Sequence, residues 1–270
     1  MSATIPGDAG LAQTILWMTR LAGGAAAINA LELWAIRTDW SDGGIWRPAT
    51  LRPTWGALTP LLGSRGFRAV RLAQLSAAMM MIASPVAALG QPVASAATAM
   101  VLLGTLLAAM RFRGTVNGGS DGMLFTVLIG LLLSRLAPPD SRWAQAGVLY
   151  IAAQLTLSYL RAGLVKVTRR PWWTGEALLA FLRLPAYGAP SPLVAWAETH
   201  PGWVRLAGLA VMSFECVALI AWRSPTWCLM VIAVALVFHG TVALLFRLNR
   251  FLWTWGAAMP SLWYAAQLLR

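Results

Sequence analysis

Long apolar runs, separated by short polar stretches, recur along the whole chain of 270 residues. A helix needs roughly 20 predominantly apolar residues to cross the hydrocarbon core of a bilayer. Runs of about that length predict an all-α polytopic transmembrane bundle of about eight spans, forming a single domain over residues 1–270 with no separate soluble domain. We place the spans near residues 11–36, 69–89, 92–110, 122–137, 144–166, 203–222, 225–246 and 250–269.

The second and third predicted spans are separated only by Gly90 and Gln91, ahead of Pro92. They form either a tight antiparallel hairpin or one broken re-entrant unit. A count of seven spans is therefore the alternative to eight, and it would move the C-terminus to the other side of the membrane.

Two connections are long enough to have structure of their own. Residues 37–68 contain the turn signal Asp42-Gly43-Gly44 among tryptophans and arginines, which predicts a lid or cap at the membrane surface. In residues 167–202, Thr174 is expected to cap a short interfacial helix with Glu176 in its first turn. The apolar face of that helix would be formed by Leu178, Leu179, Phe181, Leu182 and Leu184.

Composition supports this membrane class, because 59% of the residues are hydrophobic and 11% are charged. The net charge of +12 does not indicate a nucleic-acid partner, since the basic residues lie at span ends and follow membrane topology. Fifteen of the 21 basic residues belong to one side of the eight-span arrangement, and four belong to the other: Arg135, Arg142, Arg223 and Arg270. We therefore expect odd-numbered loops in the cytoplasm, and an integral protein of a bacterial inner (cell) membrane, in contact with the lipid bilayer.

Ionisable residues inside predicted spans are the main functional candidates, because a charge in hydrocarbon needs a partner or a cavity. They are Glu32, Lys166, Glu215 and His239. Lys166 is the only lysine, and a partly buried lysine can lose its proton and act as a base, whereas arginine stays protonated. The alternative is an interfacial lysine that extends to the headgroups.

Glu215 and His239 both lie near the middle of their spans. A Glu and a His that face one cavity can exchange protons near neutral pH, or can simply hydrogen-bond two helices together. We predict that Lys166, Glu215 and His239 surround one pocket.

Other polar residues give weaker signals. Arg111, Asn117 and Asp121 cluster before the fourth span, where Asp121 is either a binding residue or a helix cap. Cys216 and Cys228 match no metal-ligand spacing and are expected to be small core residues. The common nucleotide-binding, serine-hydrolase, zinc-peptidase and dithiol motifs are absent from the sequence.

Five further segments are informative in their order along the chain: "WSDGGIWRPATL", "NGGSDGMLFTVLIGLLLSRLAPPDSRW", "YLRAGLVKVTRRPWWTGEAL", "FECVALIAWR" and "LVFHGTVALLFRLNRF". Together they resemble the HTTM family, the membrane domain related to vitamin K-dependent gamma-glutamyl carboxylase. The third is the most specific, because it is similar to a family pattern of Tyr, Ala-Gly, Lys, Trp and Gly. The resemblance covers most of the chain.

The resemblance implies that Lys166 is the base that deprotonates a reduced, vitamin K-like quinone and so starts oxygen-dependent chemistry. His239 and Glu215 are the accompanying catalytic candidates. The expected substrate- or cofactor-binding residues are Tyr159, Trp173, Asn117, Asp121 and Arg111. We expect no metal, and a small peptide or small molecule as the substrate.

The chain departs from the carboxylase at Ser141, where the carboxylase has a histidine near its active site. Two other functions remain open from the sequence. One is non-catalytic binding, transport or immunity, with a lipid or small ligand held in the cavity. The other is a subunit of a membrane complex, packed against a partner membrane protein through small residues such as "AGGAAA" at 22–27.

Overall fold

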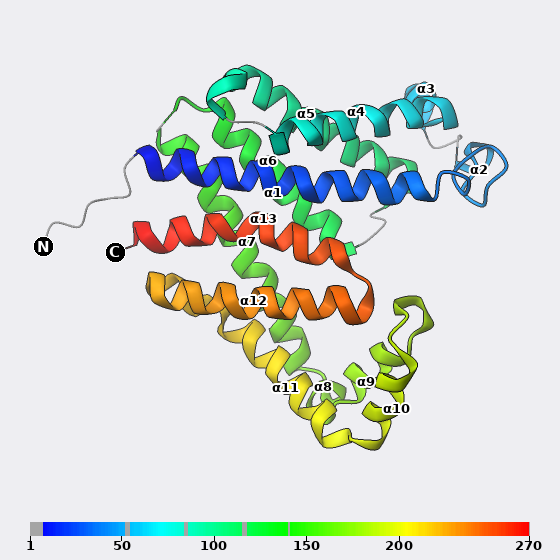
Figure 1. The fold of residues 1–270 in the computed structure, drawn as a ribbon, viewed down its shortest axis with the longest axis vertical. Helices are drawn as coiled ribbons and strands as arrows, with labels where there is room; N and C mark the ends of the chain where they lie inside the picture. The colour runs from blue at the N-terminus through cyan, green and yellow to red at the C-terminus, as the bar shows by residue number, and fades with distance from the viewer. Residues whose placement is uncertain (1–7, 52–54, 84–85, 115–117, 140, 270) are drawn as a thin grey trace, which may run out of the picture. The chain divides into compact units, whose positions relative to one another are not determined.

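The computed structural model describes residues 8–51, 55–83, 86–114, 118–139 and 141–269. Within these ranges the regular structure is helical and includes no strand, which confirms the predicted all-α class. The described chain forms two compact units, one over Asp8–Val148 and one over Leu149–Arg270. We describe each unit by itself (Figure 1).

The first unit is a bundle of long helices. In this bundle α1 packs on α4 and α6, while α5 packs on α4 and α6. Polar side chains join α4 to α5, since Arg71 donates to the Gly104 carbonyl and Gln74 donates to the Thr105 hydroxyl at 3.1 Å. The helices are α1 (Asp8–Ala35), α2 (Pro48–Leu51), η2 (Gly56–Leu58), α3 (Thr59–Leu62), α4 (Ser64–Ala83), α5 (Val86–Arg111) and α6 (Gly118–Leu136).

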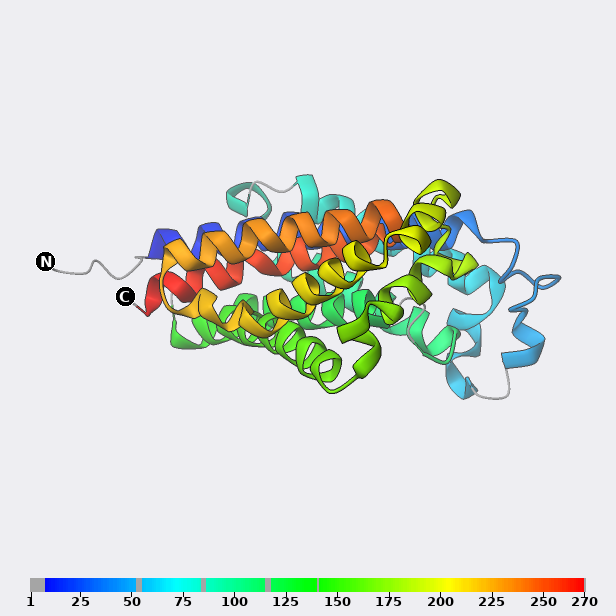
Figure 2. The same cartoon turned by 90° about the horizontal axis from the view of Figure 1, so that it is seen from below.

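The second unit begins within α7 (Arg142–Val167). Its last two helices, α12 and α13, run side by side in opposite directions (Figures 1 and 2). Short helices gather around the N-terminal end of α11. The remaining elements are α8 (Arg170–Thr174), α9 (Glu176–Arg183), η3 (Pro185–Tyr187), α10 (Ser191–Thr199), α11 (Pro201–Val217), η4 (Ala218–Trp222), α12 (Pro225–Phe246) and α13 (Asn249–Leu268).

The long helices correspond in position to the eight predicted spans. Five described segments are long and apolar enough to cross a membrane: Gln91–Arg111, Gly118–Leu136, Arg142–Val167, Pro201–Trp222 and Pro225–Phe246. Helices α1, α4 and α13 have 28, 20 and 20 residues but are not among these five. The structure therefore supports a membrane protein.

Two local predictions were wrong. Helix α5 begins at Val86 and continues through Gly90, Gln91 and Pro92, so the chain does not break where the glycine and proline suggested. Thr174 does not cap the next short helix, because it is the last residue of α8 and its hydroxyl donates to the Pro171 carbonyl at 3.3 Å. The N-cap position of α9 is occupied by Gly175, which has no side chain to accept a hydrogen bond.

Gly175 instead makes the bend between α8 and α9. Its φ of 87° lies in the left-handed region, which glycine adopts without the Cβ penalty of other residues. A Cβ at this position would lie 2.8 Å from the Arg205 nitrogen of α11. Glycine is therefore required both for the turn and for the close approach of α11.

Candidate functional site

Lys166 and Glu215 form a partly buried ion pair between α7 and α11. The Lys166 Nζ lies 2.7 Å from Oε1 and 2.6 Å from Oε2 of Glu215. The lysine side chain is 16% exposed and the glutamate side chain is 5% exposed. Both carboxylate oxygens thus accept hydrogen bonds from one ammonium group, which makes this a strong, charge-assisted contact.

Close packing of the two helices brings the pair together. Gly163 lies one turn before Lys166 on α7, and a Cβ there would lie 2.7 Å from the Cys216 Sγ and 2.8 Å from the Cys216 nitrogen. Ordinary contacts of a Cβ are 3.4–4 Å. The missing side chain of Gly163 therefore lets α11 approach closely enough for Glu215 to reach Lys166.

Trp172 completes the surroundings of the lysine. The Lys166 Nζ lies 4.9 Å from the centroid of the Trp172 ring, within range of a cation–π interaction. Trp172 belongs to α8, which packs on α11. The ammonium group is therefore held by a carboxylate and by the face of an aromatic ring.

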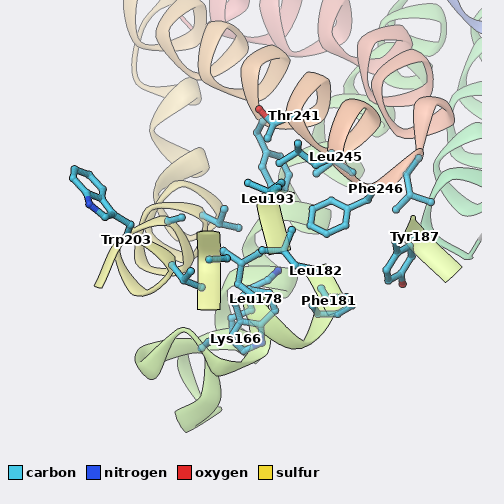
Figure 3. Close-up of a pocket in the computed structure, with 18 of the residues that line it drawn as sticks. Lys166, Leu178, Phe181, Leu182, Tyr187, Leu193, Trp203, Thr241, Leu245 and Phe246 are labelled. Carbon is cyan, nitrogen blue, oxygen red and sulfur yellow. The ribbon is translucent and has the colours of Figure 1, made fainter. Parts of the chain in front are cut away.

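The ion pair forms part of the wall of a large cavity within the second unit. The cavity has a volume of about 610 Å³. Apart from Lys166 and Glu215, its wall is made mostly of leucine, valine, phenylalanine and tryptophan side chains from α8 to α13. Figure 3 shows Lys166 and Thr241 on opposite sides of the cavity, with Leu182 and Leu193 between them.

The short helices between α7 and α11 cover this cavity. Leu182 of α9, Ala197 of α10 and Val204 of α11 are buried together, and all three line the cavity. Arg183 and Glu198 join α9 to α10 on the exposed side, with Nε and Oε1 2.8 Å apart. The segment predicted to hold one interfacial helix therefore contains α8, α9 and α10, and it builds one wall of the site.

His239 lies in the same unit but takes no part in the cavity wall. It is 2% exposed, and its Nε2 is hydrogen-bonded to the Tyr159 hydroxyl at 2.8 Å. Rings of Phe238, Phe251 and Trp255 surround the imidazole, with centroid distances of 4.9, 6.4 and 5.1 Å. Phe238 and Phe251 also line the cavity, so the Tyr159–His239 pair lies behind its aromatic wall.

The predicted trio therefore separates into two pairs. Glu215 and Lys166 share the cavity as expected, whereas His239 pairs with Tyr159 and does not line it. Tyr159 and Lys166 are seven residues apart, and thus lie on one face of α7 two turns apart. In the structure Tyr159 is hydrogen-bonded to His239, and Lys166 is paired with Glu215.

Trp173 was the binding residue predicted from the sequence, but its neighbour Trp172 lines the cavity. Trp173 is 44% exposed and donates its Nε1–H to the Val167 carbonyl at 2.8 Å. Trp172 lines the cavity and contacts the lysine. Two adjacent tryptophans are indistinguishable in the sequence, because the direction of each side chain depends on how α8 leaves α7.

The remaining predicted binding residues belong to the first unit. Arg111 is buried and donates from one Nη to the carbonyls of Trp40 and Trp46, at 2.9 and 2.7 Å. It therefore fastens the segment after α1 to the end of α5. Asp121 is the fourth residue of α6 and accepts a hydrogen bond from the Asn29 side chain at 3.2 Å, while Asn117 lies outside the described residues.

Ser141, Cys216 and Cys228 were also singled out from the sequence. Ser141 accepts a hydrogen bond from the Ala144 nitrogen at 3.1 Å and so caps the start of α7. Cys216 and Cys228 are free thiols, the first half-buried and the second buried. Among the described residues, no group of three or more His, Cys, Asp or Glu side chains could hold a metal ion.

Comparisons of the chain with protein-family models, with curated proteins and with solved structures found no match. The functional argument therefore rests on the residues themselves and on the cavity that they form.

Proposed function

We propose that this chain is a membrane enzyme that binds an amphiphile with an acidic hydroxyl group and removes the proton from that hydroxyl. The observation that carries the proposal is the Lys166–Glu215 pair in the wall of an otherwise apolar cavity. Pockets for small molecules and cofactors commonly have volumes of about 300–1,000 Å³, apolar walls and a few polar groups that orient the ligand. The cavity described above has all three properties.

The resemblance to the HTTM family supports a reduced, vitamin K-like quinone as the amphiphile. A hydroquinone has an apolar ring and tail for the leucine and aromatic wall, and a phenolic hydroxyl for the ion pair. Deprotonation would make the ring reactive towards oxygen, and a small peptide or small molecule would be the substrate that is modified. A proton transfer of this kind needs the donor and acceptor within hydrogen-bonding reach, which the wall position of the pair allows.

A second candidate function is ligand binding without chemistry, in transport, immunity or a complex. It is favoured by the closed ion pair, because a doubly hydrogen-bonded lysine and glutamate also hold two helices together. Binding and turnover therefore have to be measured separately.

The first experiment measures binding and oxygen uptake with the full chain in detergent. The ligand is a prenylated naphthohydroquinone, kept reduced until mixing, and oxygen uptake is followed with an electrode. We expect both binding and oxygen uptake by the wild type. Binding without uptake above that of protein-free micelles would favour the second function, and absence of binding would refute the proposal.

A matched pair of variants tests whether the ligand occupies this cavity. Ala207 lines the cavity, and Ala210 lies one turn away on α11 but does not line it; both are exposed. Ala207→Trp should fill part of the cavity and abolish binding, whereas Ala210→Trp should leave it unchanged. Equal effects of the two substitutions would show that the hydroquinone binds elsewhere.

We further propose that all eight long helices cross a bacterial cell membrane, with odd-numbered loops in the cytoplasm. The excess of basic residues on that side supports this orientation. A reporter fused after Arg170 should be cytoplasmic. An extracytoplasmic reporter at that position would refute the orientation and leave the site geometry unaffected.

A further inference from the structure

The surroundings of Lys166 favour the charged form of this side chain in the resting protein. Its Nζ lies 2.7 and 2.6 Å from the two oxygens of Glu215 and 4.9 Å from the ring centroid of Trp172. A carboxylate and the negative face of an aromatic ring both attract an ammonium group more strongly than a neutral amine. Lys166 therefore has no free electron pair with which to accept a proton.

From this geometry we infer that Glu215 accepts the proton and that Lys166 remains an ammonium group that binds the resulting oxyanion. The inference rests on the proposed function, since it assigns roles to the two groups of that site. In the step, the O–H bond of the ligand breaks and its electron pair stays on the ligand oxygen. A new O–H bond forms on the Glu215 carboxylate, and no oxidant or reductant is consumed.

Charge balance in the cavity supports this assignment. Before the step, the ammonium and the carboxylate sum to zero beside a neutral hydroxyl; afterwards, the ammonium and the oxyanion sum to zero beside a neutral carboxylic acid. A neutral Lys166 beside an ionised Glu215 would leave an uncompensated negative charge on a side chain that is 5% exposed. Uncompensated charge is costly in an apolar wall. A step in which the charges of the site sum to zero before and after the transfer is therefore favoured.

The geometry also gives Lys166 a continuous role. Its ammonium group is paired with the carboxylate at rest, and the oxyanion takes over that pairing as Glu215 becomes neutral. Both residues line the cavity, so a ligand hydroxyl can reach the donor and the acceptor from the same side. Lys166 thus stabilises the product of the proton transfer without itself gaining or losing a proton.

The experiment uses 4-dodecyl-2-nitrophenol, an apolar phenol whose ionised form absorbs visible light at longer wavelength than its neutral form. The full chain in detergent is mixed with this phenol at a pH at which the phenol in protein-free micelles is neutral. The methyl ether of the same compound has no proton to lose. Its competition with the phenol for the cavity measures binding separately from ionisation. Absorbance then measures ionisation of the bound phenol, and the pH change of a weakly buffered solution measures whether its proton stays on the protein or is released, without any turnover.

We compare the wild type with Lys166→Arg, Glu215→Gln and the control Glu176→Gln. Glu176 is exposed on α9 and does not line the cavity. Lys166→Arg keeps a cation and should keep most of the phenolate signal. Glu215→Gln removes the acceptor but leaves the Lys166 ammonium group without its counterion. Phenolate should therefore still form, with about one proton released to the medium for each phenolate, whereas the wild type and Lys166→Arg should release about none.

The outcomes separate the inference from the proposed function. Proton release to the medium in Lys166→Arg, without release in Glu215→Gln, would make Lys166 the acceptor and overturn the inference. Binding of a phenol that stays neutral in the wild type would also overturn it, whereas no binding at all would refute the proposed function. If Glu215→Gln fails to fold, Lys166→Arg still decides, because the two assignments predict opposite results for it.

Discussion

Gly163→Ala is the sharpest test of how the site is assembled, because it adds one methyl group where α7 meets α11. The new Cβ would lie 2.8 Å from the Cys216 nitrogen, a backbone atom that cannot rotate away. Ordinary contact begins at 3.4 Å, so the helices must separate locally by roughly 0.6 Å, the difference between 3.4 and 2.8 Å. Such a separation would lengthen the contacts between Lys166 and Glu215, which are now 2.6 and 2.7 Å.

The energetic effect combines two opposing terms. Overpacking of a well-packed contact typically destabilises a protein by about 1–3 kcal/mol. Alanine is better than glycine inside a helix by about 1 kcal/mol, which offsets part of that loss. We therefore expect a net destabilisation of up to about 2 kcal/mol, together with reduced ionisation of the bound nitrophenol.

Gly240→Ala is the matched control. Gly240 lies inside α12, and a Cβ there would meet no atom within 4 Å. This change should be neutral or stabilising, because only the helix-propensity term remains. Thermal unfolding in detergent would measure the stability of both variants. If Gly163→Ala were as stable as Gly240→Ala, or more stable, the close approach of α7 and α11 would be refuted.

Three further predictions concern single side chains. Trp172→Ala should weaken nitrophenol binding by about tenfold or more, since an aromatic wall residue is lost, whereas Trp173→Ala should change it less than about twofold; equal effects in equilibrium binding would contradict the assigned wall. Tyr159→Phe should lower the free energy of unfolding by about 1–3 kcal/mol, because it leaves the buried His239 without its partner. Tyr150→Phe on the same helix is the control, and equal midpoints of thermal unfolding for the two variants would argue against the Tyr159–His239 pair. Arg111→Met should destabilise the first unit by on the order of 2 kcal/mol and speed proteolysis within residues 37–51, because two carbonyls lose their donor; the exposed Arg113→Met should have little effect, and unchanged proteolysis of Arg111→Met would refute this role.

The candidate site illustrates how far local sequence patterns reach. Lys166 and Glu215 could be selected because each is an ionisable residue within an apolar run, and such residues require a partner. Their pairing with each other could not be selected, since 49 residues separate them and His239 was an equally reasonable partner for Glu215. The choice depends on the contact at Gly163, one of 24 glycines, and the Ala-Gly in the segment that resembles the HTTM family does not say which helix the glycine meets.

The covering helices show the same limit at shorter range. The apolar residues Leu178 and Leu182 indicated a short amphipathic helix, and α9 contains both. The bend before α9 was not predicted. Thr174 was expected to cap this helix, but it ends α8, and Gly175 makes a left-handed turn between the two helices. The separate bend between α7 and α8 determines that Trp172, and not Trp173, contacts Lys166.

By itself, the sequence determined the helical class, the positions of the long helices and the need for partners around the ionisable residues within them. These properties follow from the free energy of placing apolar and charged groups in hydrocarbon, which depends mainly on residue type and local spacing. Only the tertiary structure decided that Lys166 pairs with Glu215, that His239 pairs with Tyr159, and that the first pair opens onto a cavity. The physical reason is that such contacts depend on ångström-scale distances between helices, and those distances are set by the packing of side chains that lie far apart in the chain.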